Sequence, residues 1–186
     1  GTDLHKVTFR SDEFFLPIKE ILESPVNLFF LTNPHAPSGR LFNREKILDI
    51  VLEMEAIIVI DEAYADFASE NSVSLLEQSD KIIISRSFSK SWSLAGSRVG
   101  YAIAAPHIIT LLDSAREVYN LDRLSQAAAF ASFSDRKYFE ECCNKIIKER
   151  DRAYSFFKGL NWRTIDSEAN FLFTEPVDQK GDLKAS

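Results

Sequence analysis

Residues 56–64, AIIVIDEAY, place five apolar side chains in a row and follow them at once with two carboxylates, Asp61 and Glu62. An apolar run without polar alternation is typical of a strand that is covered on both faces, as in a parallel sheet between helices. Similar runs occur at residues 26–31 (VNLFFL) and 81–84 (KIII), and a weaker fourth run occurs at residues 99–104. We therefore expect a buried, mostly parallel sheet in the first half of the chain.

Helical patterns separate these runs and fill most of the second half. They cover residues 43–54, 108–118, 124–133 and 134–159, after which residues 162–173 look extended again. Asn43 fits an N-cap for the first of these helices, and Gly159 fits a stop for the last. Strand, helix and strand in this order predict an α/β fold in which helices flank the sheet.

The composition argues against several classes of protein. The chain has 186 residues with 28 acidic and 22 basic side chains, and a net charge of −6 argues against a nucleic-acid binder, which needs a basic face. No apolar run approaches the roughly 18 residues of a membrane span. Six glycines supply neither of the glycine-rich phosphate loops. Cys142 and Cys143 are adjacent, which does not suit an ordinary structural disulfide and favours a reducing, cytoplasmic setting.

A polar segment follows each of the first three apolar runs. These segments are residues 33–39 (NPHAPSG), 61–64 (DEAY) and 85–90 (SRSFSK). Parallel strands end at the same edge of a sheet, and open α/β sheets bind ligands at the carboxyl ends of their strands. We therefore expect the three segments to converge on one crevice. The three histidines, His5, His35 and His107, fit no metal-ligand spacing.

Asp61 ends an apolar run, where an unpaired buried carboxylate costs several kcal/mol. It therefore needs a cation or a strong hydrogen-bond donor. A helix cap or a buried salt bridge would supply one, and a bound ligand would do so as well. Another interpretation takes Asp61 and Glu62 as the acidic pair of an ATP-binding module that holds magnesium, but that module needs a phosphate loop that the chain does not contain.

Lys90 lies among serine hydroxyls, in the segment SRSFSKSWS of residues 85–93. A lysine in such a segment is commonly part of a solvated loop. Arg98 follows in GSRVG, residues 96–100. Arginine forms bidentate contacts with phosphate oxygens, and serine hydroxyls and backbone N–H groups complete such a cradle. The segment therefore has the residue types of a phosphate site as well as those of a surface loop.

Taken together, these segments resemble the fold-type I, pyridoxal-phosphate-dependent aminotransferases (class I/II), and within them the histidinol-phosphate aminotransferases most closely. The matching pieces lie in the family's order between residues 28 and 173: NPHAPSG, VIDEAYADF, SFSKSWSLAGSRVGY, VYNLDRLSQAAA and EANFLF. Each piece is weak alone. The Asp-x-x-Tyr, Ser-x-x-Lys and Lys-to-Arg spacings in one order make the resemblance specific.

The resemblance implies a role for each site residue. Lys90 would be the catalytic lysine, which forms a Schiff base with pyridoxal 5'-phosphate and then moves a proton as general base and acid. Asp61 would pair with the protonated pyridine nitrogen, and Tyr64 would donate to the phenolic oxygen of the cofactor. The cofactor phosphate would be held by Ser87, Ser89 and Arg98.

The chain also departs from the family's pattern. The family commonly has an asparagine that binds the phenolic oxygen where this chain has Ala36, so Tyr64 would make that contact alone or with a neighbour. Asn33 matches the first asparagine of the motif and is expected to shape the turn. Family members are longer, and their flanking segments supply cofactor stacking and the arginine that grips the substrate carboxylate. On the substrate side only Tyr119 and Asn170 can be matched, and Tyr119 equally fits a helix-end tyrosine.

By this resemblance the chain is the central segment of a cytoplasmic, homodimeric aminotransferase of histidine biosynthesis. It would convert imidazole acetol phosphate and glutamate into histidinol phosphate and 2-oxoglutarate, with no nucleic-acid or membrane partner. Residues 1–135 would be the large cofactor-binding domain without its N-terminal part, and residues 136–186 the connecting helix and the beginning of a smaller α+β domain. The alternatives are a threonine-phosphate decarboxylase or an aromatic aminotransferase of the same fold, the ATP-binding module, and a truncated segment without activity.

Overall fold

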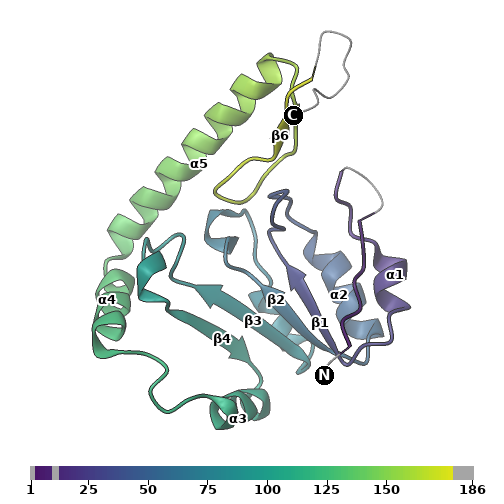
Figure 1. The fold of residues 1–186 in the computed structure, drawn as a ribbon, viewed down its shortest axis with the longest axis vertical. Helices are drawn as coiled ribbons and strands as arrows, with labels where there is room; N and C mark the ends of the chain where they lie inside the picture. Colours follow the sequence, from purple (N-terminus) through teal and green to yellow (C-terminus); the bar gives the residue numbers. More distant parts are fainter. Residues whose placement is uncertain (1–2, 10–12, 178–186) are drawn as a thin grey trace.

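A computed structural model describes residues 3–9 and 13–177 of the chain, and Figure 1 shows its helices and strands. The elements, in chain order, are α1 (Ile18–Leu22), β1 (Leu28–Thr32), α2 (Arg44–Glu53), β2 (Ile57–Asp61), η1 (Ala65–Phe67), η2 (Val73–Glu77), β3 (Ile82–Ser87), η3 (Ala95–Ser97), β4 (Gly100–Ala104), α3 (Pro106–Ala115), α4 (Arg123–Ser134), α5 (Arg136–Gly159), β5 (Arg163–Thr164) and β6 (Thr174–Glu175). Here η denotes a short 3₁₀ helix. The α/β class predicted from the sequence is confirmed.

The first four strands form one sheet in the order β1-β2-β3-β4. β1, β2 and β3 are parallel, with Leu31 beside Ile60 and Ile60 beside Ile84 in the register. β4 runs antiparallel to β3, with Ser87 beside Gly100. The sheet is therefore mostly parallel, as predicted, and the fourth apolar run is its antiparallel edge.

One face of the sheet is packed against α1 and α2. Ile58, Ile60, Ile82 and Ile84 point to this face and are fully buried, together with Ile47, Ile50 and Val51 of α2. α2 begins where the sequence predicts it, because the side chain of Asn43 accepts a hydrogen bond of 2.7 Å from the backbone N–H of Glu45. Such a cap satisfies an N–H group that has no partner within the helix.

The opposite face of the sheet is more open. Leu28 and Phe30 of β1 point to it and are 48% and 67% exposed, whereas Leu31 on the packed face is 5% exposed. The expectation that both faces are covered is therefore wrong for β1 among the described residues. The physical reason is that α1 and α2 both pack on one side, and no described helix packs over Phe30 on the other.

The second half of the chain is helical, as the sequence patterns predict. α3 ends at Ala115, before the predicted limit at residue 118, and α4 matches its prediction within a residue at each end. Asp135 caps α5 by accepting from Tyr138 N at 3.1 Å, and Gly159 is the last helical residue. In Figure 1 this long helix runs from α4 to the small β5–β6 sheet.

The prediction of an extended segment at residues 162–173 is wrong for most of its length. The strands here are only β5 and β6, with Arg163 beside Glu175, and the chain between them bends at residues 168–171. The bends are held by long-range contacts, such as the hydrogen bond of 2.8 Å from Glu168 N to Gly39 O, which local sequence does not encode. Among the described residues, no helix has the length and apolar character that crossing a membrane requires.

Candidate active site

The carboxyl ends of β1, β2 and β3 lie at one edge of the sheet. Asp61 pairs in the register with Thr32 on one side and Ser85 on the other. The backbone N–H of Asn33 donates to Asp61 O at 2.9 Å, and that of Glu62 donates to Ser85 O at 2.9 Å. The prediction that the three polar segments meet at a common edge is therefore confirmed.

Asp61 lies on the more open face of the sheet, since its register partner Ser85 shares a face with Ile83 rather than with the buried Ile84. Its Oδ1 accepts a hydrogen bond of 3.1 Å from Ala63 N, two residues on. Within the described part of the chain no cation lies at ion-pair distance from Asp61. A buried salt bridge, one of the partners expected for Asp61, is therefore wrong among the described residues. The hydrogen bond from Ala63 N is instead of the kind that a helix cap makes.

Lys90 projects from the segment of residues 88–94, named here the lysine loop. The loop closes on itself, because Leu94 N donates to Phe88 O at 2.9 Å and Ser93 N donates to Lys90 O at 3.1 Å. The Lys90 side chain is exposed, and its Nζ lies 5.4 Å from the centroid of the Tyr64 ring. The structure therefore brings the predicted lysine and tyrosine together, although they lie on different segments.

Ser87, Ser89 and Arg98 also lie close together. The hydroxyl oxygen of Ser87 accepts from Ser89 N at 3.0 Å, and Arg98 Nη1 donates to Ser89 Oγ at 3.4 Å and to Ala95 O at 3.0 Å. A guanidinium has five N–H donors, so most of those of Arg98 remain for another acceptor. Arg98 has a left-handed backbone, with φ of 53°, a conformation that is costly for a residue with a Cβ.

Three charged groups at this edge have no ion-pair partner among residues 3–9 and 13–177: Asp61, Lys90 and Arg98. One carboxylate, one amine and one guanidinium suit a ligand that carries a ring cation, an aldehyde and a phosphate. Pyridoxal 5'-phosphate has these three groups. The side chains at this edge therefore fit that cofactor.

The turn of residues 33–39 is built around Asn33, as predicted. Its amide donates to Phe42 O at 3.3 Å and accepts from Phe42 N at 2.8 Å, which ties the two ends of the turn together. His35 has its Nδ1 2.8 Å from Ser38 Oγ, and the centroid of its ring lies 4.7 Å from that of Phe9. Burial lowers the pKa of His35. The described contacts of His35 are thus with Ser38 and with phenylalanine rings, and none joins it to Tyr64.

The two substrate-side candidates differ in where they lie. Tyr119 is 92% exposed in the connection between α3 and α4, and no described hydrogen bond or ring contact joins it to the other candidates. Asn170 is exposed beside Phe171, whose ring packs edge-on against Tyr64 at 5.1 Å. The structure thus brings Asn170 near the site edge and leaves Tyr119 outside the group.

Sequence reasoning missed a buried set of polar side chains behind this edge, formed by Glu62, Asp66, Arg86 and Ser91, which we name the Arg86 cluster. Arg86 lies 2.7 Å from Glu62 and 3.0 Å from Asp66. The sequence contains a signal for this pairing. Glu62 follows Asp61, and Arg86 follows Ser85. Because Asp61 and Ser85 point to the open face, Glu62 and Arg86 point to the packed face.

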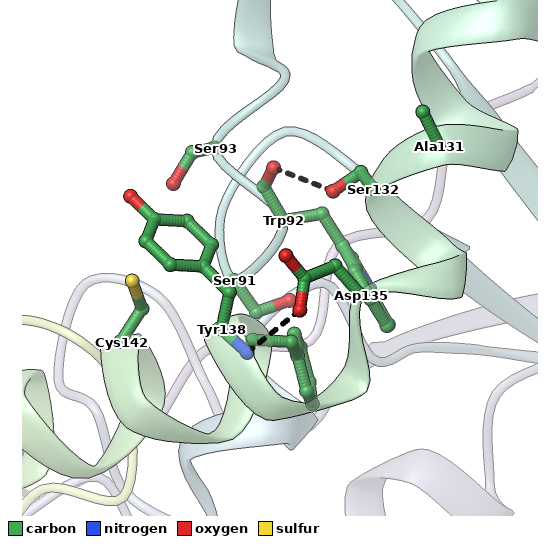
Figure 2. Close-up of a pocket in the computed structure, with 9 residues that line it drawn as sticks. Ser91, Trp92, Ser93, Ala131, Ser132, Asp135, Tyr138 and Cys142 are labelled. Carbon is green, nitrogen blue, oxygen red and sulfur yellow. Dashed lines mark hydrogen bonds between the residues drawn. The ribbon is translucent and has the colours of Figure 1, made fainter.

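A small hollow of about 210 Å³ lies between the lysine loop and the first turns of α5. Figure 2 shows Ser91, Trp92 and Ser93 of the loop together with Tyr138 and Cys142 of α5, which all line this hollow. Ser132 Oγ donates to Trp92 O at 3.3 Å, one of the two bonds drawn. None of the predicted cofactor residues lines this hollow, so it is separate from the candidate site.

Comparison with known proteins gives one family. The family model described as aminotransferase class I and II matches residues 6–186. The histidinol-phosphate aminotransferase of Syntrophotalea carbinolica is 46% identical over 154 residues, which is 83% of this chain and 44% of that protein. The chain therefore spans less than half the length of this curated relative.

Solved structures of similar fold agree with this family. The histidinol-phosphate aminotransferase of Sinorhizobium meliloti, in complex with pyridoxal-5'-phosphate, matches with a TM-score of 0.77 and 26% identity over 85% of this chain and 44% of that chain. A decarboxylase from Sulfurospirillum multivorans matches with a TM-score of 0.76 and 25% identity over 88% of this chain and 51% of that one. The match supports an aminotransferase-type fold over the magnesium-holding module.

Proposed function

The chain belongs to the class I and II aminotransferase family, and from that premise we propose that the complete protein is a pyridoxal-phosphate-dependent histidinol-phosphate aminotransferase. Its reaction would convert imidazole acetol phosphate and glutamate into histidinol phosphate and 2-oxoglutarate. The observation that carries this proposal is the 46% identity to a histidinol-phosphate aminotransferase over 83% of the chain. The three uncompensated charges at the sheet edge support it independently.

Each candidate residue would have one task at the cofactor. Asp61 would hold a proton on the pyridine nitrogen, and Tyr64 would donate to the phenolic oxygen without help from Ala36. The phosphate would accept hydrogen bonds from Ser87, Ser89 and Arg98. When bound, pyridoxal phosphate supplies an electron sink for the bonds at the α-carbon of an amino acid.

Lys90 would anchor the cofactor through its Nζ and later act as the proton carrier. Its amine, once free, would take a proton from the substrate α-carbon and return it at the neighbouring position, as a general base and then a general acid. Its exposure on the lysine loop and its position beside Tyr64 support this role, because a proton carrier must reach both substrate and cofactor.

The lysine assignment is tested by Lys90→Ala in the complete protein, with the exposed Lys137→Ala as a matched control. Borohydride reduction of the cofactor-loaded protein should add the cofactor mass to the peptide that contains Lys90, and Lys90→Ala should abolish this adduct and lower transamination at least about a thousandfold. Lys137→Ala should retain both. An adduct on another lysine, or full activity in Lys90→Ala, would contradict the assignment.

A second function on the same fold is a decarboxylase, which the similarity to the Sulfurospirillum multivorans protein favours. Both enzymes would use Lys90, Asp61 and Arg98, so the site residues do not separate them. The products do. Incubation with glutamate and imidazole acetol phosphate should give 2-oxoglutarate, whereas release of carbon dioxide from a phosphorylated amino acid would identify the decarboxylase.

We further propose that the chain divides at residue 135 and that the protein is a cytoplasmic homodimer. The beginning of α5 at Arg136 and the separation of β5 and β6 from the four-stranded sheet support the division. Two free cysteines support a reducing compartment. Exposed apolar side chains on α3 and α4, such as Leu124 and Phe130, support an assembly that covers them. Light scattering of the complete protein should give twice the mass of its chain.

The 186-residue chain alone offers a further test, because a segment without the flanking parts could lack activity. We expect it to retain cofactor binding, since Asp61, Lys90 and Arg98 all lie within it. A visible absorbance change on addition of pyridoxal phosphate, lost in Lys90→Ala, is the expected result. No change in the wild-type chain would show that the flanking parts are required even for binding.

A further inference from the structure

The Arg86 cluster joins three segments of the chain through one guanidinium. Arg86 Nε and Nη2 lie 2.8 and 2.7 Å from Glu62 Oε2, and Arg86 Nη1 lies 3.0 Å from Asp66 Oδ1. The other carboxylate oxygen of Asp66 accepts a hydrogen bond from the hydroxyl of Ser91. The cluster thus runs from the end of β2, through the end of β3, to the lysine loop.

The cluster is shielded from solvent. The side chains of Glu62, Arg86 and Asp66 are 0%, 11% and 20% exposed, and Ser91 is 3% exposed. The remaining oxygen of Glu62 accepts from Ser72 N, so that no carboxylate oxygen of Glu62 is left without a donor. Buried charges are costly to remove from water, and the planar guanidinium, which gives two N–H groups to one oxygen of Glu62 and a third to Asp66, fixes the relative positions of the two carboxylates. The cluster therefore fixes the relative positions of its side chains more firmly than an apolar contact of similar area would.

Three of the four members of the cluster are next to a residue of the candidate site in the sequence. Glu62 follows Asp61, Arg86 precedes Ser87, and Ser91 follows Lys90. Successive residues of a strand point to opposite faces, so Asp61 and Ser87 lie toward the open face while Glu62 and Arg86 lie behind them. The Arg86 guanidinium therefore holds in place the backbone segments that carry Asp61, Ser87 and Lys90.

We propose that the Arg86 cluster is a positioning unit, which sets the distance of Lys90 from Asp61 through the hydrogen bond between Ser91 and Asp66. This inference rests on the proposed function, in which the Lys90 amine moves a proton. Arg86, Asp66 and Ser91 touch neither substrate nor cofactor in this role. They act through the loop, and a shift of about 1 Å in a reacting group is enough to lower a rate roughly a hundredfold.

The lysine loop has a second attachment, which makes the role of Ser91 separable from folding. The Trp92 ring stacks on Phe139 at 3.8 Å, and the Trp92 carbonyl accepts from Ser132. Figure 2 shows the hydrogen bond between Ser132 and Trp92 that forms part of this attachment. Loss of the Ser91 hydroxyl therefore leaves the loop fastened at Trp92 and frees it locally beside Lys90.

The experiment compares Ser91→Ala with Ser93→Ala in the complete, cofactor-loaded protein. Both variants remove one hydroxyl from the lysine loop, and of these two hydroxyls only that of Ser91 has a described hydrogen bond to Asp66. For Ser91→Ala we expect kcat to fall roughly tenfold with KM changed less than about twofold, because proton transfer is misaligned while substrate contacts persist. Ser93→Ala should keep both constants near their wild-type values.

Two further measurements make the test specific. Amide hydrogen exchange of the peptide that spans the lysine loop, measured without cofactor, should become faster in Ser91→Ala and remain unchanged in Ser93→Ala. In a double-mutant cycle, Ser91→Ala combined with Asp66→Ala should lower kcat no more than Asp66→Ala alone, since both substitutions remove the same hydrogen bond.

Several results would overturn the inference. Equal kcat values for Ser91→Ala and Ser93→Ala would do so, and so would additive losses in the cycle or a rise in KM with kcat unchanged. A failure of the proposed function is distinguishable, because borohydride would then leave no cofactor mass on Lys90 even in the wild-type protein. Retained labelling of Lys90 together with an inert Ser91→Ala would contradict the positioning role alone.

Discussion

The molecule has a sheet half, residues 18–104, and a helical half, residues 106–160. The two halves differ in how far their apolar side chains are buried. In the sheet half, Ile58, Ile60 and Ile84 are fully buried against α1 and α2. In the helical half, Leu124 is 83% exposed and Phe130 is 76% exposed. The sheet half therefore has its own core among the described residues, while the helices present apolar surface that suits further packing.

One arginine pair from each half shows the same contrast in burial. Arg86 is bonded to two carboxylates in the interior of the sheet half. On α5, Arg152 pairs with Glu149 while their side chains are 75% and 65% exposed. Every residue predicted to hold the cofactor lies in the half with the buried core and buried charges. The comparison indicates that a precise site depends on a scaffold that is already fixed, and the following predictions test this.

The largest effect is expected from Arg86→Met. Removing the guanidinium leaves Glu62 and Asp66 with buried charges and no counterion, which should lower the free energy of unfolding by about 3–5 kcal/mol. Arg152→Met, on the exposed face of α5, should cost less than about 1 kcal/mol. Urea unfolding monitored by circular dichroism measures both values. Equal losses of unfolding free energy in the two variants would show that the ion pairs of the two halves contribute equally to stability.

Next in size is the loss of a core side chain. Ile84→Ala should lower the free energy of unfolding by about 2–5 kcal/mol, because it removes buried methylenes and leaves a cavity. Phe130→Ala should change it by no more than about 0.5 kcal/mol in the 186-residue chain. A loss for Phe130→Ala that matches that of Ile84→Ala would mean that a second copy of the chain, or a part not described, covers α4.

A smaller effect is expected from Gly39→Ala, at the contact between the turn of residues 33–39 and the segment before Phe171. Gly39 has φ of 77°, and an added Cβ would lie 2.1 Å from Ser167 Oγ. Strain and displacement should cost about 1–3 kcal/mol of stability. Gly159→Ala, which meets no atom within 4 Å at the end of α5, should instead stabilise the chain by about 0.5 kcal/mol. Thermal unfolding measures whether Gly39→Ala lowers the stability of the chain while Gly159→Ala raises it.

The smallest effect concerns the one buried residue of α5. Burial raises the pKa of the Cys143 thiol to about 11, and the nearby charge of Asp66 adds to the shift. At pH 8, iodoacetamide should therefore modify the more exposed Cys142 and leave Cys143 largely unmodified, because the thiolate is the nucleophile. Labelling of Cys143 should rise as the pH approaches 11. Peptide mass spectrometry after short exposure measures the ratio.

The same pKa gives the sign of a stability change. The folded protein holds the Cys143 proton up to about pH 11, whereas the unfolded chain releases it near its ordinary value, so stability is present below that value and falls as the pH rises between the two. Replacing Cys143 with Ala should remove this alkaline loss. An unaltered pH dependence in that variant would assign the loss to other groups.

Much of the site was predictable because its residues follow apolar runs directly. Asp61 ends β2 and Lys90 follows β3, so the topology alone brings their segments to one edge. Tyr119 shows the limit of the same reasoning, since a match to a family pattern did not place its ring beside the others. Phe171 was not predicted as part of the site, because its contact with Tyr64 depends on how the turns after α5 return to the sheet.

The sequence by itself determined the four strands of the main sheet, the Asn43 cap of α2 and the order of polar segments, because these depend on the spacing of neighbouring side chains. Only the tertiary structure decided which face of the sheet is open and which partners Arg86 finds. Glu62 lies 24 positions and Asp66 lies 20 positions from Arg86 in the chain, and their meeting depends on the register of β2 and β3. No local pattern encodes that register, because it is fixed by packing of the whole sheet against α1 and α2.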